Sequence, residues 1–200
     1  MLINTFEKEK IKDVLLNDGV IAFVTDTVWG LGCIPESEIA VEKIYGIKHR
    51  DKTKPLILMS GEIYPLLKYV SPLSKTAHML IKKYFPGALT IVVSKSDLTY
   101  EYITSKKSTV GIRVPDNELF AEICSCAPSK VLATTSANIS SRAPALTYDE
   151  VLKDLGGSVD YIVNDYGYKA SGCASTVLAV YDNDIRILRE GACRINLPVI

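Results

Sequence analysis

The chain has 200 residues, the length of one compact domain that buries roughly 70% of the surface of its unfolded chain. Its 48% hydrophobic and 23% charged content excludes a disordered or repetitive protein. The 23 basic and 23 acidic side chains cancel, which argues against a broad nucleic-acid footprint, and no apolar run reaches the roughly 20 residues of a membrane span. We therefore expect a soluble, cytoplasmic protein with a single domain over residues 1–200.

The cysteines are odd in number and scattered along the chain. No Cys-x-x-Cys pair is present, so neither a disulfide framework nor a zinc site is a good interpretation. We expect free thiols in a reducing compartment and no protein-bound metal. The five residues are Cys33, Cys124, Cys126, Cys173 and Cys193.

The first half of the chain predicts helices and strands in alternation. A first helix follows Asn4 or Thr5 and ends at Asp18-Gly19, before a strand at 20–24 that is buried on both faces. A strand at 56–59 precedes helices at 61–69 and at 71–84, the latter with Pro72 at its first position. Ser37 begins a further helix, whose inward-facing residues we expect to be Ile39, Ala40, Ile44 and Tyr45.

The second half predicts more strands than helices. Apolar runs predict strands at 89–93, 110–114, 130–134, 161–163, 176–180 and 185–188, the last two joined by a hairpin around Asp182-Asn183-Asp184. Helices are expected at 118–124 and 147–155, where Thr147 and Glu150 fit a capping box. Because crossover helices are mixed with a hairpin, we expect an α/β fold with a twisted mixed sheet and flanking helices.

A basic segment, residues 48–54, is the first candidate for binding a phosphorylated ligand, since the familiar nucleotide-binding loops are absent. In an extended loop, alternate side chains point the same way, so four cations could form a row that faces one polyanion. A solvated charged turn is the alternative. The row would contain Lys48, Arg50, Lys52 and Lys54.

Hydroxyl groups and isolated arginines follow several of the expected strands. The run 133–142, Ala-Thr-Thr-Ser-Ala-Asn-Ile-Ser-Ser-Arg, either is a capped turn or lines a pocket for sugar or phosphate oxygens. Arg113 and Arg189 lie among strand apolar residues, where each faces either water or a site that needs a fixed cation. Ser175 and Thr176 precede another strand, with hydroxyls free to contact a ligand.

Together, seven short motifs in one order resemble the YrdC-like family. They are Thr25-Asp-Thr-Val-Trp-Gly-Leu-Gly32, Lys48-His-Arg-Asp51, Pro86-Gly-Ala-Leu-Thr90, Gly111-Ile-Arg-Val-Pro115, Ser136-Ala-Asn138, Ser175-Thr-Val177 and Leu188-Arg-Glu-Gly191. Each motif is weak alone, but the set covers nearly the whole chain.

The resemblance implies a YrdC-like fold with a concave basic cleft and the activity of a threonylcarbamoyl-AMP synthase. In that reaction L-threonine, bicarbonate and ATP, accompanied by Mg²⁺, give threonylcarbamoyl-adenylate and pyrophosphate. The product is used for threonylcarbamoyladenosine at position 37 of certain tRNAs, so tRNA or tRNA-modification proteins are implied as further partners.

The matching positions also carry over the family's site residues. Lys48 and Arg50 would be catalytic through their charge. The residues implied for threonine are Thr27, Arg113, Thr134 and Ser175, and those implied for ATP are Arg50, Lys54, Thr109, Ser136, Asn138 and Arg189.

Departures from the family pattern leave the choice of amino acid open. Val24 replaces a proline, Trp29 a tyrosine and Asp51 a proline, and residues 141–144 read Ser-Arg-Ala-Pro instead of Ser-Gly-x-Pro. Met59 stands where relatives often have a polar residue. A paralogue that uses a different acceptor, and a double-stranded RNA or tRNA binding module, are the alternative interpretations.

Overall fold

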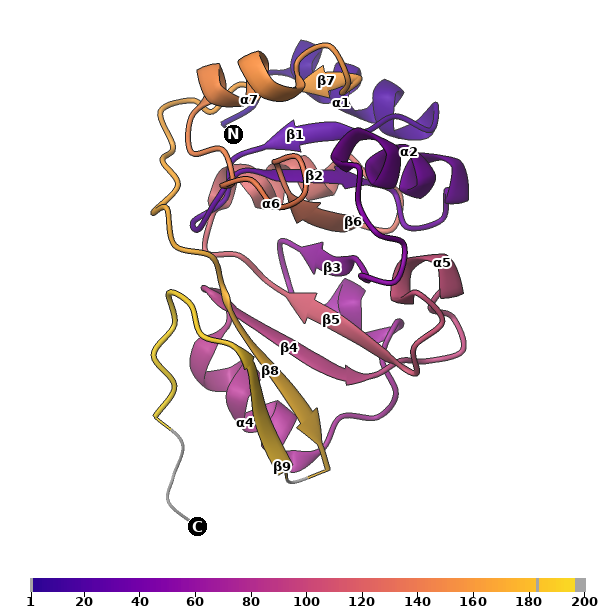
Figure 1. The fold of residues 1–200 in the computed structure, drawn as a ribbon, viewed down its shortest axis with the longest axis vertical. Coiled ribbons are helices and arrows are strands. Elements are labelled where there is room, and N and C mark those ends of the chain that lie inside the picture. Colours follow the sequence, from indigo (N-terminus) through magenta and orange to yellow (C-terminus); the bar gives the residue numbers. More distant parts are fainter. Residues whose placement is uncertain (1, 183, 197–200) are drawn as a thin grey trace.

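The computed structural model describes residues 2–182 and 184–196, and its strands form one mixed sheet (Figure 1). The described strands follow the order β7-β1-β2-β6-β3-β5-β4-β8-β9 across the sheet. The predicted mixed α/β fold is therefore confirmed. The strands are β1 Ile21–Phe23, β2 Gly30–Cys33, β3 Ile57–Ser60, β4 Leu89–Ser94, β5 Thr109–Arg113, β6 Val131–Ser136, β7 Tyr161–Ile162, β8 Thr176–Tyr181 and β9 Asp184–Arg189.

Pairings between distant segments decide where the site lies. Strands β1 and β7, β3 and β5, and β4 and β8 pair in parallel, and the other neighbours are antiparallel. Central strand β6 runs antiparallel to both β2 and β3, with Ser136 opposite Gly30 and Thr134 opposite Ile57. The end of β6 is thereby brought beside the start of β2 and the start of β3.

Each of the longer helices begins at a polar residue whose side chain accepts a backbone N–H. These N-caps are Asn4, Ser37, Ser74, Asn117 and Thr147. In Figure 1, α1 and α7 lie at the β7 end of the sheet and α4 lies at the β8–β9 end. The helices are α1 Thr5–Leu16, α2 Glu38–Lys48, α3 Tyr64–Leu67, α4 Lys75–Tyr84, α5 Glu101–Thr104, α6 Glu118–Ser125 and α7 Tyr148–Leu155.

Several helix predictions were wrong in detail. The helix expected from Ser71-Pro72 begins at Lys75, because the Ser71 N–H is committed to Ser94 O at 2.9 Å and the chain there is extended. The helix expected at 61–69 is the single turn α3. Ile39, expected to face inward, is 61% exposed, since it lies beside the buried stripe of α2.

The capping box of α7 is only half formed. The Glu150 N–H bonds Thr147 Oγ1 at 3.2 Å as predicted, but the Glu150 carboxylate accepts from the Leu146 N–H at 2.7 Å instead of returning to Thr147. Strands β8 and β9 form the predicted antiparallel pair. Residue 183 of the predicted hairpin turn lies outside the described residues.

Strand β2 and the one-turn helix α5 were not predicted. In β2 two glycines dilute the strand signal, yet a Cβ on either Gly30 or Gly32 would lie 2.8 Å from the ring of Phe23. The glycines let β2 pair with β1 beneath this ring, which also contacts Phe120 with ring centroids 5.0 Å apart. Phe23 is thus wedged between β2 and α6 at one wall of the site.

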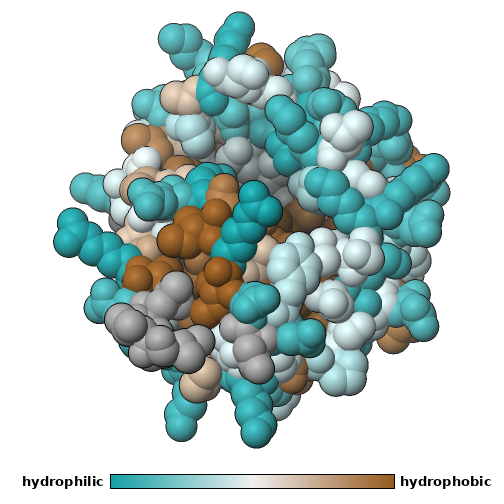
Figure 2. Space-filling view, turned by 60° about the horizontal axis from the view of Figure 1, so that its bottom comes forward, coloured by the Kyte–Doolittle hydropathy of each residue, from teal (hydrophilic) through white to brown (hydrophobic). Residues whose placement is uncertain are grey.

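The far end of the sheet is less covered than its centre. Strand β9 is the last strand in the order, and its Ile187 and Leu188 are exposed, as is Met79 of α4. Figure 2, in which the bottom of Figure 1 comes forward, shows apolar surface among hydrophilic side chains on this face. Among the described residues, none of the helices has the length and apolar character needed to cross a membrane.

Candidate active site

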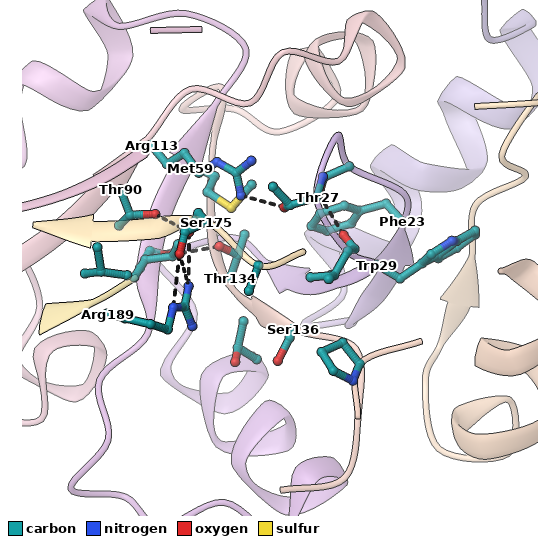
Figure 3. Close-up of a pocket in the computed structure, with 18 of the residues that line it drawn as sticks. Phe23, Thr27, Trp29, Met59, Thr90, Arg113, Thr134, Ser136, Ser175 and Arg189 are labelled. Carbon is teal, nitrogen blue, oxygen red and sulfur yellow. Dashed lines mark hydrogen bonds between the residues drawn. The ribbon is translucent and has the colours of Figure 1, made fainter. Parts of the chain in front are cut away.

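A cavity of about 220 Å³ lies where β1, β2, β3, β6 and the start of β8 meet (Figure 3). Its lining spans the sequence from Phe23 to Arg189. Three arginines line it, from three different segments, together with a row of hydroxyl groups and a few apolar side chains. The predicted residues among its lining are Thr27, Arg50, Arg113, Thr134, Ser136, Ser175 and Arg189.

Arg113, at the end of β5, is 4% exposed and held by three hydrogen bonds. Its Nε donates to Gly87 O at 2.9 Å, Nη1 donates to Thr27 Oγ1 at 2.9 Å, and Nη2 donates to Asp26 Oδ1 at 2.6 Å. Burial lowers the pKa of Arg113 and Asp26 opposes this, but a guanidinium stays charged in proteins. Three of its five N–H groups are used, which leaves two for a carboxylate.

Ser175, just before β8, joins Arg189 to Thr90. Arg189 donates from both Nε and Nη2 to Ser175 O, at 3.0 and 2.8 Å, and its Nη2 also lies 3.1 Å from Ser175 Oγ. The Ser175 and Thr90 hydroxyls are 2.9 Å apart. Because β4 and β8 are parallel neighbours, these residues come together although they are far apart in sequence.

Arg50 enters the cavity from the segment that follows α2. Its Nε donates to Lys54 O at 3.2 Å and its Nη2 to Pro55 O at 3.0 Å, so the guanidinium is tied to its own loop. Burial lowers the pKa of Arg50. Thr134 lies across the cavity and donates from Oγ1 to Ile57 O at 3.2 Å.

Trp29 is among the lining residues, and its indole ring is directed away from the arginines and hydroxyls of the cavity (Figure 3). This side chain is fully buried and meets the Tyr148 ring edge-on, with centroids 6.1 Å apart. The Trp29 N–H bonds Ala145 O at 3.1 Å, and Trp29 O accepts the Ala137 N–H at 2.7 Å. The main chain of Trp29, just before β2, therefore holds both ends of segment 137–145, which contributes Pro144 to the lining. Met59 adds a buried thioether nearby (Figure 3).

The predicted row of four cations is not present. Helix α2 extends through Lys48, and His49 takes the left-handed conformation that ends it, with φ 48°. Lys52 points to the carboxylate of Glu42. Arg50 alone of the four lines the cavity, because a helix end and a turn replace the extended loop.

Lys48 is buried behind the cavity instead of lining it, with 1% of its surface exposed. Its Nζ donates to Ser136 O, to Asn138 O at 2.6 Å and to Asn138 Oδ1 at 3.2 Å. Burial, with a smaller contribution from Arg50, lowers the pKa of Lys48 to about 7. Three further predicted ATP residues, Lys54, Thr109 and Asn138, also lie outside the lining.

Two residues that orient predicted site residues had no predicted role. Thr90 supports Ser175, and Asp26 orients Arg113. Both belong to motifs that were singled out, Pro86–Thr90 and Thr25–Gly32, so the signal was present. Their roles depend on strand pairings that a single sequence does not reveal.

The cysteines take no part in this arrangement. All five are free, and none lines the cavity. Burial raises the pKa of Cys33 and Cys124 well above the usual range, which keeps these thiols protonated and unreactive.

The fold is therefore that of an α/β protein whose mixed sheet gathers arginines and hydroxyls from seven segments at one cavity. Residues 13–191 match the Sua5/YciO/YrdC family model, whose description is "Telomere recombination". The chain belongs to this family.

The most informative relatives are archaeal and bacterial. A Methanocaldococcus jannaschii protein is 34% identical over 94% of this chain and 89% of its own length. An Idiomarina loihiensis protein named threonylcarbamoyl-AMP synthase is 30% identical, covering 88% of this chain and 94% of its own length.

A solved structure agrees with these relatives. The crystal structure of P. abyssi Sua5 complexed with L-threonine superposes on 94% of this chain with a TM-score of 0.87 and 29% identity. The chain spans 55% of the length of that protein.

Proposed function

We propose that this chain is a threonylcarbamoyl-AMP synthase, which makes threonylcarbamoyl-adenylate and pyrophosphate from L-threonine, bicarbonate and ATP. The observation that carries the proposal is the convergence of Arg50, Arg113 and Arg189 on one cavity that also holds the Thr27, Thr134 and Ser175 hydroxyls. The names of the relatives supply the particular reaction. Residues 1–200 would act as one catalytic domain.

The threonine half of the site would lie around Arg113. A carboxylate fits the two unused N–H groups of this guanidinium, which Asp26 and Gly87 O hold in a fixed plane. The remaining ligands would be the hydroxyls of Thr27, Thr134 and Ser175. Since these groups are positioned before the ligand arrives, binding costs little reorganisation.

The ATP half would use the remaining cations. Arg50 and Arg189 would bind phosphate oxygens, and Ser136 would contribute its hydroxyl; Lys54, Thr109 and Asn138 complete the proposed ATP set. Mg²⁺ would arrive with ATP as part of the substrate complex.

The proposed reaction requires correct alignment of the carbamate and ATP more than it requires a protein side chain that acts as a base. The threonine amine and bicarbonate give a carbamate and water, and a carbamate oxygen then attacks the α-phosphorus while pyrophosphate leaves. Arg113 and Arg50 approach the cavity from separate segments, so they would hold the two reactants side by side and offset the charge that builds up on the phosphoryl group. The apolar lining residues, among them Ile57, Met59 and Pro144, would exclude water that hydrolyses the adenylate.

The decisive experiment measures pyrophosphate release from ATP and Mg²⁺ with labelled bicarbonate. We expect release that requires L-threonine, together with incorporation of label into a nucleotide product. Release that is unaffected by omission of threonine would rule the proposal out. In the cell we place the activity in the cytoplasm, where the adenylate would pass to tRNA or tRNA-modification proteins.

A different amino-acid acceptor is the second candidate, and Met59 favours it. This side chain is 5% exposed and lines the cavity without offering a hydrogen bond to a hydroxyl-bearing substrate. A panel of L-threonine, L-serine, L-valine and L-2-aminobutyrate separates the two, because a preference for 2-aminobutyrate over threonine identifies an apolar pocket.

A further inference from the structure

We propose that Lys48 is a positioning residue, which sets the geometry of segment 136–142 from behind and does not contact the substrate. The proposal rests on the proposed function only for its catalytic consequence. Its structural part concerns the ligand-free protein, so that it can fail or succeed independently of the reaction.

The Lys48 amine uses its hydrogen-bond donors within the protein. In its charged form the Lys48 Nζ has three N–H donors, and three oxygens accept from it, Ser136 O, Asn138 O and Asn138 Oδ1. All three come from one short segment. No donor remains for a phosphate, and the side chain is buried outside the cavity lining, so contact with a ligand would require the segment to open.

The segment depends on this anchor at several points. Asn138 uses its own amide to bond Ile139 O at 2.9 Å and Arg142 O at 2.8 Å, and its Oδ1 accepts from Ser136 Oγ at 2.5 Å. The main chain of α2 adds a second tie, because the Ser140 N–H bonds Lys48 O at 2.8 Å. The end of α2 therefore holds segment 136–142 through hydrogen bonds that involve both the side chain and the backbone of Lys48.

The consequence for the site is the direction of Ser136. Its carbonyl accepts from Lys48, and the N–H of the same peptide group, that of Ala137, donates to Trp29 O, so the peptide that follows the Ser136 side chain is fixed at both of its polar atoms. Loss of the amine would leave two buried carbonyls without their donor, and the segment would then open more often.

The protonation of Lys48 is also expected to respond to an anion bound in the cavity, without direct contact between the two. Arg50 is the charged group that acts on the amine, His49 and Arg142 are exposed, and segment 136–142 offers it uncharged oxygens. Because burial lowers its pKa to about 7, the amine of the free protein loses its charge and one of its three donors as the pH rises from 6 to 8. Bound triphosphate favours the charged form, so ATP binding at pH 8 is expected to take up a proton at Lys48.

The primary test is amide hydrogen exchange of the ligand-free protein. Lys48→Met removes the donors, and Lys52→Met is the matched control, since Lys52 is exposed and points to Glu42. We expect amides of 136–142 to exchange at least about tenfold faster in Lys48→Met and unchanged in Lys52→Met. Unchanged exchange in Lys48→Met, combined with weaker ATP binding, identifies a phosphate ligand and overturns the proposal.

Lys48→Arg distinguishes the hydrogen bonds that Lys48 donates to segment 136–142 from the change in its protonation. It also tests the proposal if Lys48→Met does not fold. Arginine keeps the donors but does not titrate, so we expect exchange within about threefold of wild type. Calorimetry of ATP binding at pH 8 in buffers of different ionisation enthalpy should give proton uptake for wild type and none for Lys48→Arg. Wild-type binding without proton uptake, or exchange as fast in Lys48→Arg as in Lys48→Met, contradicts the inference.

Discussion

Single atoms of the site are fixed by partners that lie far away in the sequence. Arg113 takes its orientation from Asp26 and Gly87, and Ser175 takes its own from Thr90 and Arg189. The sequence motifs predicted which arginines and hydroxyls matter. They did not predict which residues orient them, because hydrogen bonds between residues 14 to 87 positions apart depend on strand pairing.

Thr27→Val tests the Arg113 pair without changing side-chain shape. The substitution removes the acceptor at 2.9 Å from Nη1, and we expect the KM for threonine to rise about 10- to 100-fold, the equivalent of a hydrogen bond to a charged group. The KM for ATP should change less than about threefold. Thr104→Val is the control, since Thr104 is equally buried but lies in α5. Equal effects of the two variants would count against the proposed threonine site.

Arg50→Ala tests the nucleotide half. We expect ATP affinity to fall about tenfold or more in calorimetry, while the free energy of unfolding changes by about 1 kcal/mol, because Arg50 belongs to a surface loop. Arg186→Ala, in exposed β9, should leave ATP affinity unchanged. ATP affinity that survives Arg50→Ala would move the phosphates to another part of the cavity.

Helices and strands were predicted well where apolar residues recur at a clear helical or strand spacing. They were predicted poorly where glycines weaken that spacing or where local hydrogen bonds move the start of a helix. The strands at β4, β5, β6 and β8 match their predicted positions to within two residues. Strand β2 was not predicted because its two glycines carry no strand preference, although these glycines allow the Phe23 ring to pack against β2. Helix α4 began late because Ser74, not Ser71, caps it.

Gly32→Ala is expected to destabilise the protein by about 1–3 kcal/mol in chemical unfolding. The new methyl group would lie 2.8 Å from Phe23 Cε1, and this ring is already packed on Phe120. Gly46→Ala is the matched control in α2, where a Cβ meets nothing within 4 Å, and it should be neutral or stabilising by up to about 1 kcal/mol. A neutral Gly32→Ala would show that β2 shifts freely.

At the scale of the molecule, the cavity joins both halves of the sheet. Lining residues come from β1 and β2 on one side and from β4, β5 and β8 on the other, so a ligand connects segments that the chain itself links only through long crossovers. The mixed α/β fold class was predicted from the sequence. The strand order was not, since many orders fit the same succession of helices and strands.

Ligand binding should therefore raise the melting temperature. At a threonine concentration about 100 times Kd, binding adds about 2.7 kcal/mol, which corresponds to roughly 5–10 °C for a chain of this size. D-Threonine at the same concentration is the control. An equal shift with both enantiomers would indicate a general solute effect and no stereospecific site.

The strand order also has a meaning for biosynthesis. Strands β7 and β8, made late, pair with β1 and β4, made early, so the early strands leave the ribosome with bare edges that wait for their neighbours. Such edges invite pairing with other chains. A polypeptide interrupted before residue 161 would lack Ser175 and Arg189 and would keep both edges open, so an unfinished copy would be inactive and prone to aggregate.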